Sequence, residues 1–485
     1  MSKLRVMYIL NNYPQISQTY IQAEIEALEQ DCDIRIIALR SPNVPAANSS
    51  PFQQRDDPDE IMEAIEEFQP HILHGHWLLQ TRILAYFAGY FSGPSGRRNI
   101  PFTLRAHSFD VLDYGGKYIR ESAPMINSGL CLGIISLPFT RPLLEAGGIR
   151  SEKIHDCFPA INYRRFYDTS PNGESIMNVG ACLPKKKMSD FLELASDLPN
   201  LQFNLYPLGY ETPEIKRVNA QMNNPVNIVP PVQPVEMLAE YKKHRWLVYT
   251  ASRELNTNGW PMAVAEAQAA GVGVCFPNIR PDLKEYLGGA GFLYESVSDA
   301  ARIISEPFPD EMRERGFVQA RKSDVFEHKT ILLDLWQEAM GSERHGQEPA
   351  QYPDAGVLSW GEGHTQLEFG QRIKLASLEI EGAVPSGATI AMIDGQSNCC
   401  SDEAASQRRV IRPEISDGEA LGPPTNDEEA IRMLEDLRRS GAHFIAFAWP
   451  AFWWLDYYAD LHRHLRSNFR RVLENNNLVI FDLRT

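Results

Sequence analysis

The sequence predicts an α/β protein with two tandem Rossmann-like domains and a smaller α/β domain at its C-terminal end. Compact apolar runs, typical of buried parallel strands, alternate with segments whose apolar residues recur at helical spacing. This alternation begins again near Ser175, and a chain of 485 residues is too long for a single hydrophobic core. Strands that alternate with helices favour doubly wound sheets, which bind ligands at the carboxyl ends of their strands.

The first domain is expected to span residues 1–166. In its first helix, Ile21, Ile25 and Leu28 fall at helical spacing. Strands are predicted at 4–10, 33–39, 71–77, 102–107 and 132–137, and helices at 21–30, 61–68, 81–91 and 140–147.

The second domain is expected to span residues 167–340 and to form a cleft with the first. Its last helix, at 328–340, is long and amphipathic. Strands are predicted at 175–181, 201–209, 245–251 and 272–276, and the other helices at 188–198, 235–244, 262–270 and 298–304.

Residues 341–356 are polar and contain Pro and Gly, which predicts a linker before a third domain at 357–485. In that domain a polar insertion is expected over 397–428. Strands are predicted at 375–382, 388–394, 443–449 and 477–483, and helices at 427–441 and 454–469. For one aromatic cluster a core position is favoured over a sugar- or partner-binding surface, because it joins an apolar strand to a helix: Trp449, Phe452, Trp453, Trp454, Tyr457 and Tyr458.

Composition restricts the partners and the compartment. The net charge of −16 argues against nucleic acid as the main partner, although basic residues can still gather around an anionic small ligand. No apolar run approaches the roughly 20 residues of a membrane span. The first apolar run is too short for a signal peptide, so a cytoplasmic protein is expected. The seven cysteines show no metal-ligand spacing, and we expect neither a structural disulfide nor a zinc site.

The stretch from Thr250 to Pro277 is expected to organise the ligand site. Pro261 suits the first position of a helix, and the amides after it are free at the positive end of the helix dipole, where anions bind. Glu266, about one turn later, can accept hydrogen bonds from a diol. An anion site beside a diol acceptor suggests a nucleotide or a nucleotide sugar. The alternative is an ordinary loop–helix–strand unit.

Further candidates lie where strands are predicted to end. Lys185, Lys186 and Lys187 can meet a pyrophosphate, and a solvated basic turn is the alternative. His107 can hydrogen-bond a hydroxyl or a phosphate, although a lone histidine is more often structural.

His74 and His76 lie two residues apart on one predicted strand, so their side chains point the same way. They could contribute to a metal site, but the sequence shows no third ligand. We therefore expect the pair to line the cleft, with no metal.

Several motifs of the first 340 residues, taken in order, resemble those of the retaining glycosyltransferases of family 4, which have the GT-B fold. YPQISQTYIQAEIEAL resembles the family's first loop and helix, HILHGHW its second-strand motif and RAHSFDV its acceptor-side loop. FPAINYRRF resembles the crossing segment between the domains, VGACLPKKK the phosphate-binding loop, and GWPMAVAEAQAAGVGVCFP the donor motif. The resemblance implies a metal-independent enzyme that needs no cofactor beyond a nucleoside-diphosphate sugar as donor.

The resemblance also implies roles for individual residues. Lys186 aligns with the lysine that neutralises the donor's diphosphate, Glu266 with the acid that binds the donor ribose, and His107 with the histidine near the anomeric centre. The donor site is expected to include, in addition, Ser17, Lys185, Arg253, Asn258, Gly259, Trp260 and Met262.

Two positions depart from the family pattern. The first acid of the family's E-x7-E motif is Asn258 here, which can hydrogen-bond a hydroxyl but carries no charge, and the usual arginine of the phosphate loop is Ala181. Glu254 could replace the acid, and Arg253 or Lys185 the cation. The departures motivate one alternative, a non-catalytic nucleotide-sugar or glycan-binding subunit. A GT-B-type sugar-nucleotide epimerase is another.

Residues 357–485 resemble a small α/β domain appended to many bacterial polysaccharide-type glycosyltransferases, through PSGATIAMID, LEDLRRSGAHFIAFAWPAFWWLDYY and LVIFDLR. We expect this domain to dock or position the acceptor. The resemblance implies that the acceptor is a saccharide or a lipid-linked saccharide of the bacterial surface. Peripheral contact with the inner face of the membrane would suit such an acceptor, but no strongly basic amphipathic helix supports it.

Overall fold

The computed structural model describes residues 3–484 except for 42–44, 48, 90–98, 113, 210, 255–256, 342–375, 378, 395–407, 414, 417–418, 421–423, 425, 449–450, 453, 456–457 and 476. The chain forms two compact units, Met1–Gln366 and Leu367–Thr485. The predicted linker lies, from residue 342 on, outside the described residues. So do much of the predicted insertion at 397–428 and Trp449, Trp453 and Tyr457.

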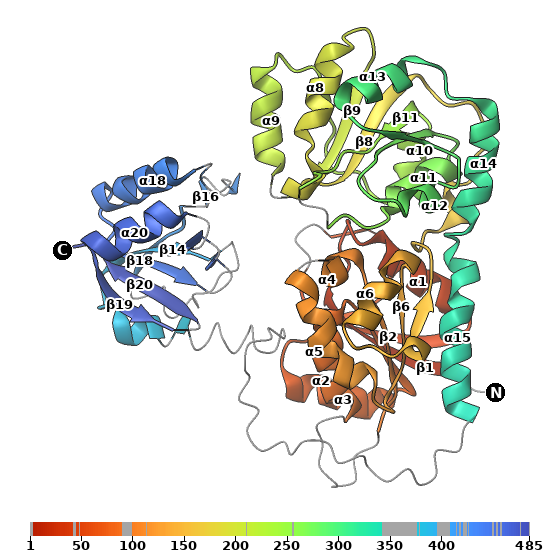
Figure 1. The fold of residues 1–485 in the computed structure, drawn as a ribbon. Helices are drawn as coiled ribbons and strands as arrows, with labels where there is room; N and C mark the ends of the chain where they lie inside the picture. The colour runs from red at the N-terminus through yellow and green to blue at the C-terminus, as the bar shows by residue number, and fades with distance from the viewer. Residues whose placement is uncertain are drawn as a thin grey trace. The chain divides into compact units, whose positions relative to one another are not determined.

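The first Rossmann-like domain has a sheet of seven described strands, all parallel, in the order β3-β2-β1-β4-β5-β6-β7. The central strand β4 is buried at every position, as expected for a parallel sheet with helices on both faces. The strands are β1 (Leu4–Asn12), β2 (Cys32–Arg40), β3 (Gln53–Gln54), β4 (Ile72–His76), β5 (Phe102–Arg105), β6 (Cys131–Ser136) and β7 (Ile154–Asp156). The helices are α1 (Thr19–Leu28), α2 (Pro58–Phe68), α3 (Thr81–Ala88), α4 (Ser108–Leu112), α5 (Lys117–Ile126), α6 (Arg141–Ala146) and α7 (Tyr163–Phe166) (Figure 1).

The second Rossmann-like domain repeats the plan with six described strands, again all parallel, in the order β10-β9-β8-β11-β12-β13. One face of the sheet packs against α11 and α12, and the other against α8 and α13. The strands are β8 (Ser175–Ala181), β9 (Phe203–Leu208), β10 (Asn227–Ile228), β11 (His244–Val248), β12 (Gly273–Pro277) and β13 (Phe292–Tyr294). The helices are α8 (Ser189–Asp197), α9 (Thr212–Gln221), α10 (Met237–Tyr241), α11 (Met262–Ala269), α12 (Leu283–Leu287), α13 (Val297–Ser305) and α14 (Asp310–Arg321).

The last described helix of the first unit, α15 (Val325–Gly341), returns to the first domain (Figure 1). Its Leu332 and Trp336 are fully buried in the core that β1 and α1 form. The indole Nε1 of Trp336 donates a hydrogen bond to Thr103 Oγ1 on β5 at 2.9 Å. The domain boundaries predicted from the sequence place this helix in the second domain, whereas its apolar residues pack into the core of the first domain.

The two chain crossings between these domains lie side by side. Ile161, on the first crossing, donates its N–H to the carbonyl of Ser323 at 2.9 Å and accepts the N–H of Val325 at 2.9 Å. Ile161 and Asp324 form a parallel β-bridge. The crossings are therefore hydrogen-bonded to each other and not only to the domains.

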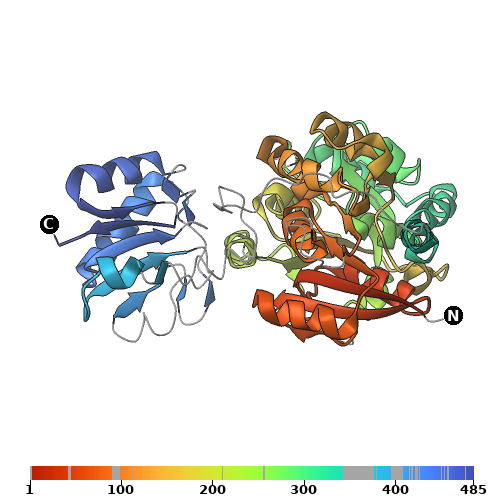
Figure 2. The ribbon, with the colours of Figure 1, turned by 90° about the horizontal axis from the view of Figure 1, so that it is seen from below.

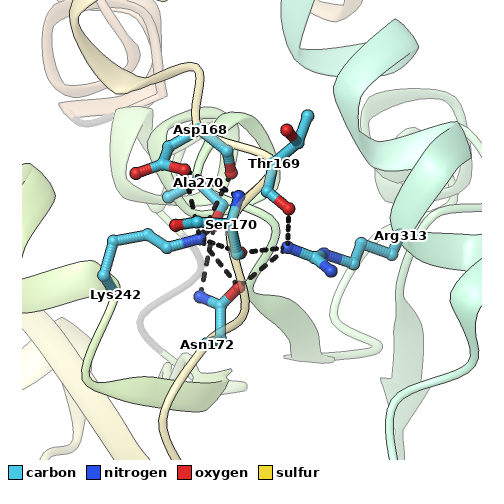
Figure 3. A network of polar contacts seen from close by, with 7 residues as sticks. All are labelled: Asp168, Thr169, Ser170, Asn172, Lys242, Ala270 and Arg313. Atoms are coloured by element: carbon cyan, nitrogen blue, oxygen red, sulfur yellow. Dashed lines mark hydrogen bonds and ion pairs between the residues drawn. The ribbon is translucent and has the colours of Figure 1, made fainter.

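A polar network holds the first crossing to the second domain (Figure 3). Lys242 Nζ donates to the carbonyl of Ala270 and to Asn172 Oδ1, both at 3.1 Å, and Arg313 donates to the same Oδ1 at 3.3 Å. Backbone carbonyls of residues 168–170 accept further bonds from the two cations. Since Ala270 is the C-cap of α11, the network also fixes the end of that helix.

The second unit has a mixed sheet of five described strands in the order β15-β14-β18-β20-β19. β14, β15 and β18 are parallel, and β20 is antiparallel to β18 and β19. Helices α18 and α20 cover one face and residues 376–383 the other (Figures 1 and 2). The elements are β14 (Thr389–Ile393), β15 (Arg409–Ile411), α18 (Asp427–Arg439), β18 (Phe444–Ala448), α20 (Ala459–Asn468), β19 (Arg470–Glu474) and β20 (Leu478–Asp482), with a short antiparallel pair, β16 (Ile415–Ser416) and β17 (Glu419–Ala420).

The strand predicted at 375–382 is wrong, because residues 376–377 and 379–383 are helical. Ala376, Ile380 and Val384 lie four residues apart and are all buried against the sheet. The same segment alternates apolar and acidic residues, so it fits a strand period as well, and the tertiary contact decides. The core position favoured for the aromatic cluster is confirmed for Trp454 and Tyr458, which are buried.

In the part of the chain that the structure describes, none of the helices combines the length and the apolar character that crossing a membrane requires.

Candidate functional site

His107 lies at the carboxyl end of β5, just before α4. Its backbone N–H donates to Asp110 Oδ1 at 2.8 Å, and Asp110 Oδ2 accepts the backbone N–H of Leu78 at 2.5 Å. Leu78 follows Trp77, which has a positive φ of 70° at the end of β4. Burial raises the pKa of Asp110 to about 7. Through these two hydrogen bonds, the carboxyl group of Asp110 joins the loops that follow the neighbouring strands β4 and β5.

The imidazole of His107 is held from its buried side. Its Nε2 lies 3.0 Å from His76 Nδ1, and the two ring planes are inclined by only 17° with centroids 5.3 Å apart, so the rings meet edge to edge. The rings of Tyr20 and Trp77 lie 4.6 and 5.2 Å away. Burial, then the neighbouring His76 and Arg105, lower the pKa of His107 well below its usual value, so the ring is neutral at pH 7. Among the described residues, none hydrogen-bonds its Nδ1.

Lys185 and Lys186 end the short 3₁₀ turn η5 (Pro184–Lys186) that follows β8. Lys186 Nζ contacts the Tyr249 hydroxyl and lies 4.7 Å from the centre of that ring. Burial, then the charge of Lys185, lower the pKa of Lys186 to about 7, and no carboxylate of the described chain counteracts them. Lys185 Nζ donates to the carbonyl of Thr257 at 3.3 Å. The turn thus presents two ammonium groups to the loop before α11.

Asn258, in the loop before α11, is 1% exposed. Its Nδ2 donates to the carbonyl of Lys185 at 2.9 Å, and its own carbonyl accepts from Arg280. Its Oδ1 is buried without a hydrogen-bond partner. Because an unsatisfied buried oxygen costs about 1–3 kcal/mol, a ligand hydroxyl that reaches Oδ1 would be stabilised there.

Gly259 brings this loop against the first domain. A Cβ atom at this position would lie 2.4 Å from Ser108 Cβ and 2.7 Å from Ser108 Oγ. The approach requires glycine, and it sets the loop beside the residue that follows His107. Lys185 Nζ also lies 5.8 Å from the ring centre of Phe109 on α4.

The loop after β1 reaches the same junction. Ser17 is exposed in the turn before α1. Two residues later, Thr19 Oγ1 lies 3.9 Å from Met262 Sδ. Met262 is the first residue of α11, and Pro261 is its N-cap instead of its predicted first residue. Val264 donates its N–H to the carbonyl of Pro261 at 3.1 Å, whereas the amides of Met262 and Ala263 lack a carbonyl partner within the helix by position, and such a helix end can attract an anion.

Glu266 is 8% exposed on α11. Its Oε2 accepts the Tyr241 hydroxyl at 2.8 Å, and no described residue hydrogen-bonds Oε1. Burial raises the pKa of Glu266 to about 7. The free oxygen leaves this carboxylate able to accept a hydrogen bond from a diol.

Trp260 has partners within the protein. It is 4% exposed, its Nε1 donates to Asp282 Oδ2 at 2.7 Å, and its ring stacks on Tyr286 with centroids 4.9 Å apart. Phe139 and Phe158 lie 5.5 and 4.9 Å away on the other side of the domain junction. The indole therefore packs the two domains together.

Arg253 also has partners of its own. Its guanidinium donates to the carbonyl of Asn278 at 3.1 Å and to the carbonyl and carboxylate of Glu295 at 2.7 and 3.1 Å. Glu254 is exposed, and its N–H donates to Ser252 Oγ. The contacts of Arg253 lie at the ends of β12 and β13, whereas Lys185 and Lys186 contact Thr257 and Tyr249.

A buried network behind His107 was not predicted. Glu24, from α1, lies with His74 and His76 so that one ligand-type atom of each falls within 4.8 Å of the others. The sequence showed the two histidines on one strand, but Glu24 is some 50 residues away along the chain. Arg105 donates to the same carboxylate at 2.7 Å, so a guanidinium already neutralises it. This favours an ion-pair network over a metal site.

Comparison with solved structures finds the arrangement of the first unit in proteins of low sequence identity. HepE from Anabaena, in complex with UDP, has a TM-score of 0.54 at 12% identity, over 69% of this chain and 100% of that one. A sucrose-phosphate synthase from Thermosynechococcus elongatus has a TM-score of 0.55 at 14% identity, over 70% and 100%. HepE in complex with UDP-glucose has a TM-score of 0.51 at 12% identity, over 69% and 98%.

No protein-family model matches the sequence, and no curated protein matches it. The structural likeness, at these identities, shows the fold alone. Two parallel-sheet Rossmann-like domains with their strand ends at a common junction form the GT-B fold, which confirms the predicted fold class.

Proposed function

We propose that the chain is a retaining, metal-independent glycosyltransferase that moves a sugar from a nucleoside-diphosphate sugar to a saccharide or a lipid-linked saccharide. The observation that carries the proposal is the contact of Gly259 with Ser108, which joins the lysine turn and Asn258 to the His107 loop. The fold that the chain shares with HepE, whose structures hold UDP and UDP-glucose, supports this donor class.

In the proposal the diphosphate binds between the lysine turn and the start of α11. Lys185 and Lys186 bring two ammonium groups, and the first amides of α11 point out at the positive end of the helix dipole. Negative charge grows on the leaving diphosphate, and stabilising it there is the main catalytic task. Fixed cations and amides supply that stabilisation without a metal ion.

The ribose and the transferred sugar bind on either side of the diphosphate. Glu266 Oε1 accepts from the ribose diol, because its other oxygen is occupied by Tyr241. Asn258 Oδ1 accepts from a hydroxyl of the sugar, which would satisfy its buried oxygen. Since Asn258 carries no charge, this contact selects a hydrogen-bond donor and not a cation.

The acceptor enters from the first domain, beside His107. The neutral imidazole, held by His76 at its Nε2, faces the reacting sugar. Closing the two domains over the sugar excludes water and limits hydrolysis of the donor. The second unit positions the acceptor, and the protein works in the cytoplasm in surface polysaccharide synthesis. The role of the second unit and the role in polysaccharide synthesis rest on the motif resemblance.

The test is an assay of nucleoside-diphosphate release from a panel of nucleotide sugars, with and without cell-envelope saccharides. We expect release from one donor that rises when its acceptor is present and persists in EDTA. Transfer to the acceptor with an unchanged anomeric configuration, read from the NMR coupling of the product's anomeric proton, checks retention.

The main alternative is a non-catalytic nucleotide-sugar or glycan-binding subunit, which Asn258, Ala181 and the engaged guanidinium of Arg253 favour. Donor binding without release from any member of the panel would support that alternative and contradict the enzyme. An epimerase would instead convert the donor to an isomeric nucleotide sugar with no acceptor present.

A further inference from the structure

Glu24 lies at the centre of a buried hydrogen-bond network behind the candidate site. It is 1% exposed, and its Oε2 accepts from Arg105 Nε at 2.7 Å. Its Oε1 accepts from the Tyr8 hydroxyl and from His74 Nε2, both at 3.1 Å. Burial opposes its ionisation, but Arg105 and the histidines outweigh burial and hold the pKa of Glu24 well below its usual value. An ionised carboxylate only accepts hydrogen bonds.

The positions of the protons on His74 follow from this carboxylate. Because the ionised carboxylate only accepts, the His74 nitrogen that faces it, Nε2, carries a proton, and the hydroxyl of Thr103 contacts the other nitrogen, Nδ1. Thr103 Oγ1 lies 2.7 Å from that Nδ1 and accepts the indole N–H of Trp336 at 2.9 Å. The Thr103 hydroxyl can therefore donate its own proton to His74. Every hydrogen-bonding atom in this arm of the network has a matching partner.

The same argument applies to His76, one pleat further along β4. Its Nε2 lies 3.3 Å from Glu24 Oε1, makes no regular hydrogen bond to it, and has no other hydrogen-bond partner. A carboxylate oxygen at this distance attracts an N–H and repels a lone pair. Burial lowers the pKa of His76 to about 4, so the ring is neutral and carries one proton. That proton belongs on Nε2, and Nδ1 is left as an acceptor.

The position of the proton on His107 follows from the position of the proton on His76. His107 Nε2 lies 3.0 Å from His76 Nδ1, which carries a lone pair, so Nε2 is the nitrogen that carries the proton of the neutral His107 ring. The second nitrogen, Nδ1, has no partner among the described residues. The next residue, Ser108, is the one that packs against Gly259 of the donor loop. The chain of contacts thus runs from a buried carboxylate to a ring at the domain junction.

We infer that Glu24 and His76 are positioning residues for His107: they fix its proton on Nε2 and present Nδ1 as a hydrogen-bond acceptor only. Such a nitrogen attracts a hydroxyl and repels the oxygen of a carboxylate or a phosphate. The group that meets His107 is therefore a hydroxyl of the saccharide. The identity of this ligand rests on the proposed function, whereas the positions of the protons do not.

The tautomer can be observed directly in the full-length protein labelled with ¹⁵N in its histidine rings. Long-range ¹H–¹⁵N correlation spectra distinguish a protonated ring nitrogen from an unprotonated one, and His107→Gln identifies the His107 signals by their loss. We expect one neutral tautomer for His107, with the proton on Nε2, at pH 7. A proton on Nδ1, or a mixture of the two tautomers, in the unaltered protein would overturn the inference.

Two substitutions of His76 test the cause. His76→Leu removes the acceptor, and since a buried N–H without a partner is costly, the His107 proton should move to Nδ1. His76→Gln can donate an amide N–H to Glu24 and accept with its oxygen, so it should retain the proton on Nε2. Tyr8→Phe removes another contact of the same carboxylate and should leave His107 unchanged. A proton on Nε2 of His107 in a folded His76→Leu protein would contradict the role of His76.

These spectra need no substrate, so the two proposals can fail separately. A protein that releases no nucleoside diphosphate but shows the expected tautomers would lose the proposed function and keep the positions of the protons. An active transferase whose His107 exchanges freely between the two tautomers would keep the proposed function and lose the inferred positions of the protons. Thermal unfolding of each variant establishes that it is folded before its spectrum is compared.

Discussion

Gly259 and Ser108 lie so close that a Cβ atom on the glycine would come within 2.4 Å of Ser108 Cβ. The two residues are far apart in the sequence and belong to different Rossmann-like domains. This contact sets the separation of the loop before α11 from the loop that follows His107.

Gly259→Ala should therefore impair function more than folding. The added methyl group must push the two loops apart, so we expect kcat/KM to fall at least about tenfold, equivalent to roughly 1.4 kcal/mol. The thermal midpoint should change little, because separating the domains at this point relieves the clash. Gly382→Ala is the matched control, since a Cβ there meets no atom within 4 Å. Equal activity of the two variants would show that the contact does not matter.

Lys186→Met should weaken binding of the nucleoside diphosphate that the release assay identifies, measured by isothermal titration calorimetry. The lost charge-assisted contact is worth about 1.5–3 kcal/mol, or roughly 10- to 150-fold in Kd. Lys187→Met is the control, because Lys187 is exposed and pairs with Asp190 at 3.2 Å. Its Kd should stay within about threefold of the original.

The lowered pKa of Lys186 also predicts that the protein takes up a proton when it binds the diphosphate. With a pKa of about 7, its amine is mostly neutral at pH 8, and a bound diphosphate should return the proton. Titrations in buffers of different ionisation enthalpy should therefore show uptake at pH 8 that diminishes at pH 6. Lys186→Met should show less uptake at pH 8. Identical uptake by both proteins would exclude Lys186 as the source.

Glu266 should make the protein less stable as the pH rises from about 4.5 to 7. Burial raises the pKa of Glu266 from 4.5 to about 7, so in this interval the folded protein holds a proton that the unfolded chain has lost. Glu266→Gln lacks that titration. Urea midpoints at pH 5 and pH 7 should therefore show the variant gaining stability relative to the original as the pH rises. The exposed Glu285→Gln should show no such trend.

Trp336→Ala should destabilise the first domain even though the residue lies on the last helix of the first unit. Removing a fully buried indole costs about 3–5 kcal/mol, and the hydrogen bond to Thr103 is lost with it. Met340→Ala, on the same helix but 51% exposed, should stay within about 0.5 kcal/mol. Denaturant unfolding followed by circular dichroism measures both.

Local patterns were enough to predict the main elements of the fold. The run LRVMYIL and the spacing of Ile21, Ile25 and Leu28 each fit one period and appear as β1 and α1. Patterns failed where two periods coincide, as at residues 375–382, and where an element is too short to show a period, as in β7 and β10. In those places only contacts with the rest of the sheet determine the structure.

The residues of the candidate site also fall into those that the sequence pattern identifies and those that only the fold brings together. The order of the predicted elements is enough to identify Lys186, Asn258 and Glu266 as candidates, because they lie close to strand ends and to the start of a helix. Glu24 does not stand out, because an acid on an amphipathic helix is usually solvated, and only the fold brings Arg105 to it. The packed indole of Trp260 and the paired Arg253 also depend on residues distant in the chain. Their predicted roles in donor binding stay predictions.

The return of α15 to the first domain has a consequence for synthesis of the protein. Domains commonly fold in order as they leave the ribosome. Here the face formed by β1 and α1 lacks Leu332 and Trp336 until the whole second domain has been translated. The newly made first domain therefore keeps an exposed apolar surface until α15 has been synthesised. If translation stops before residue 325, the product retains that surface and is a substrate for chaperones.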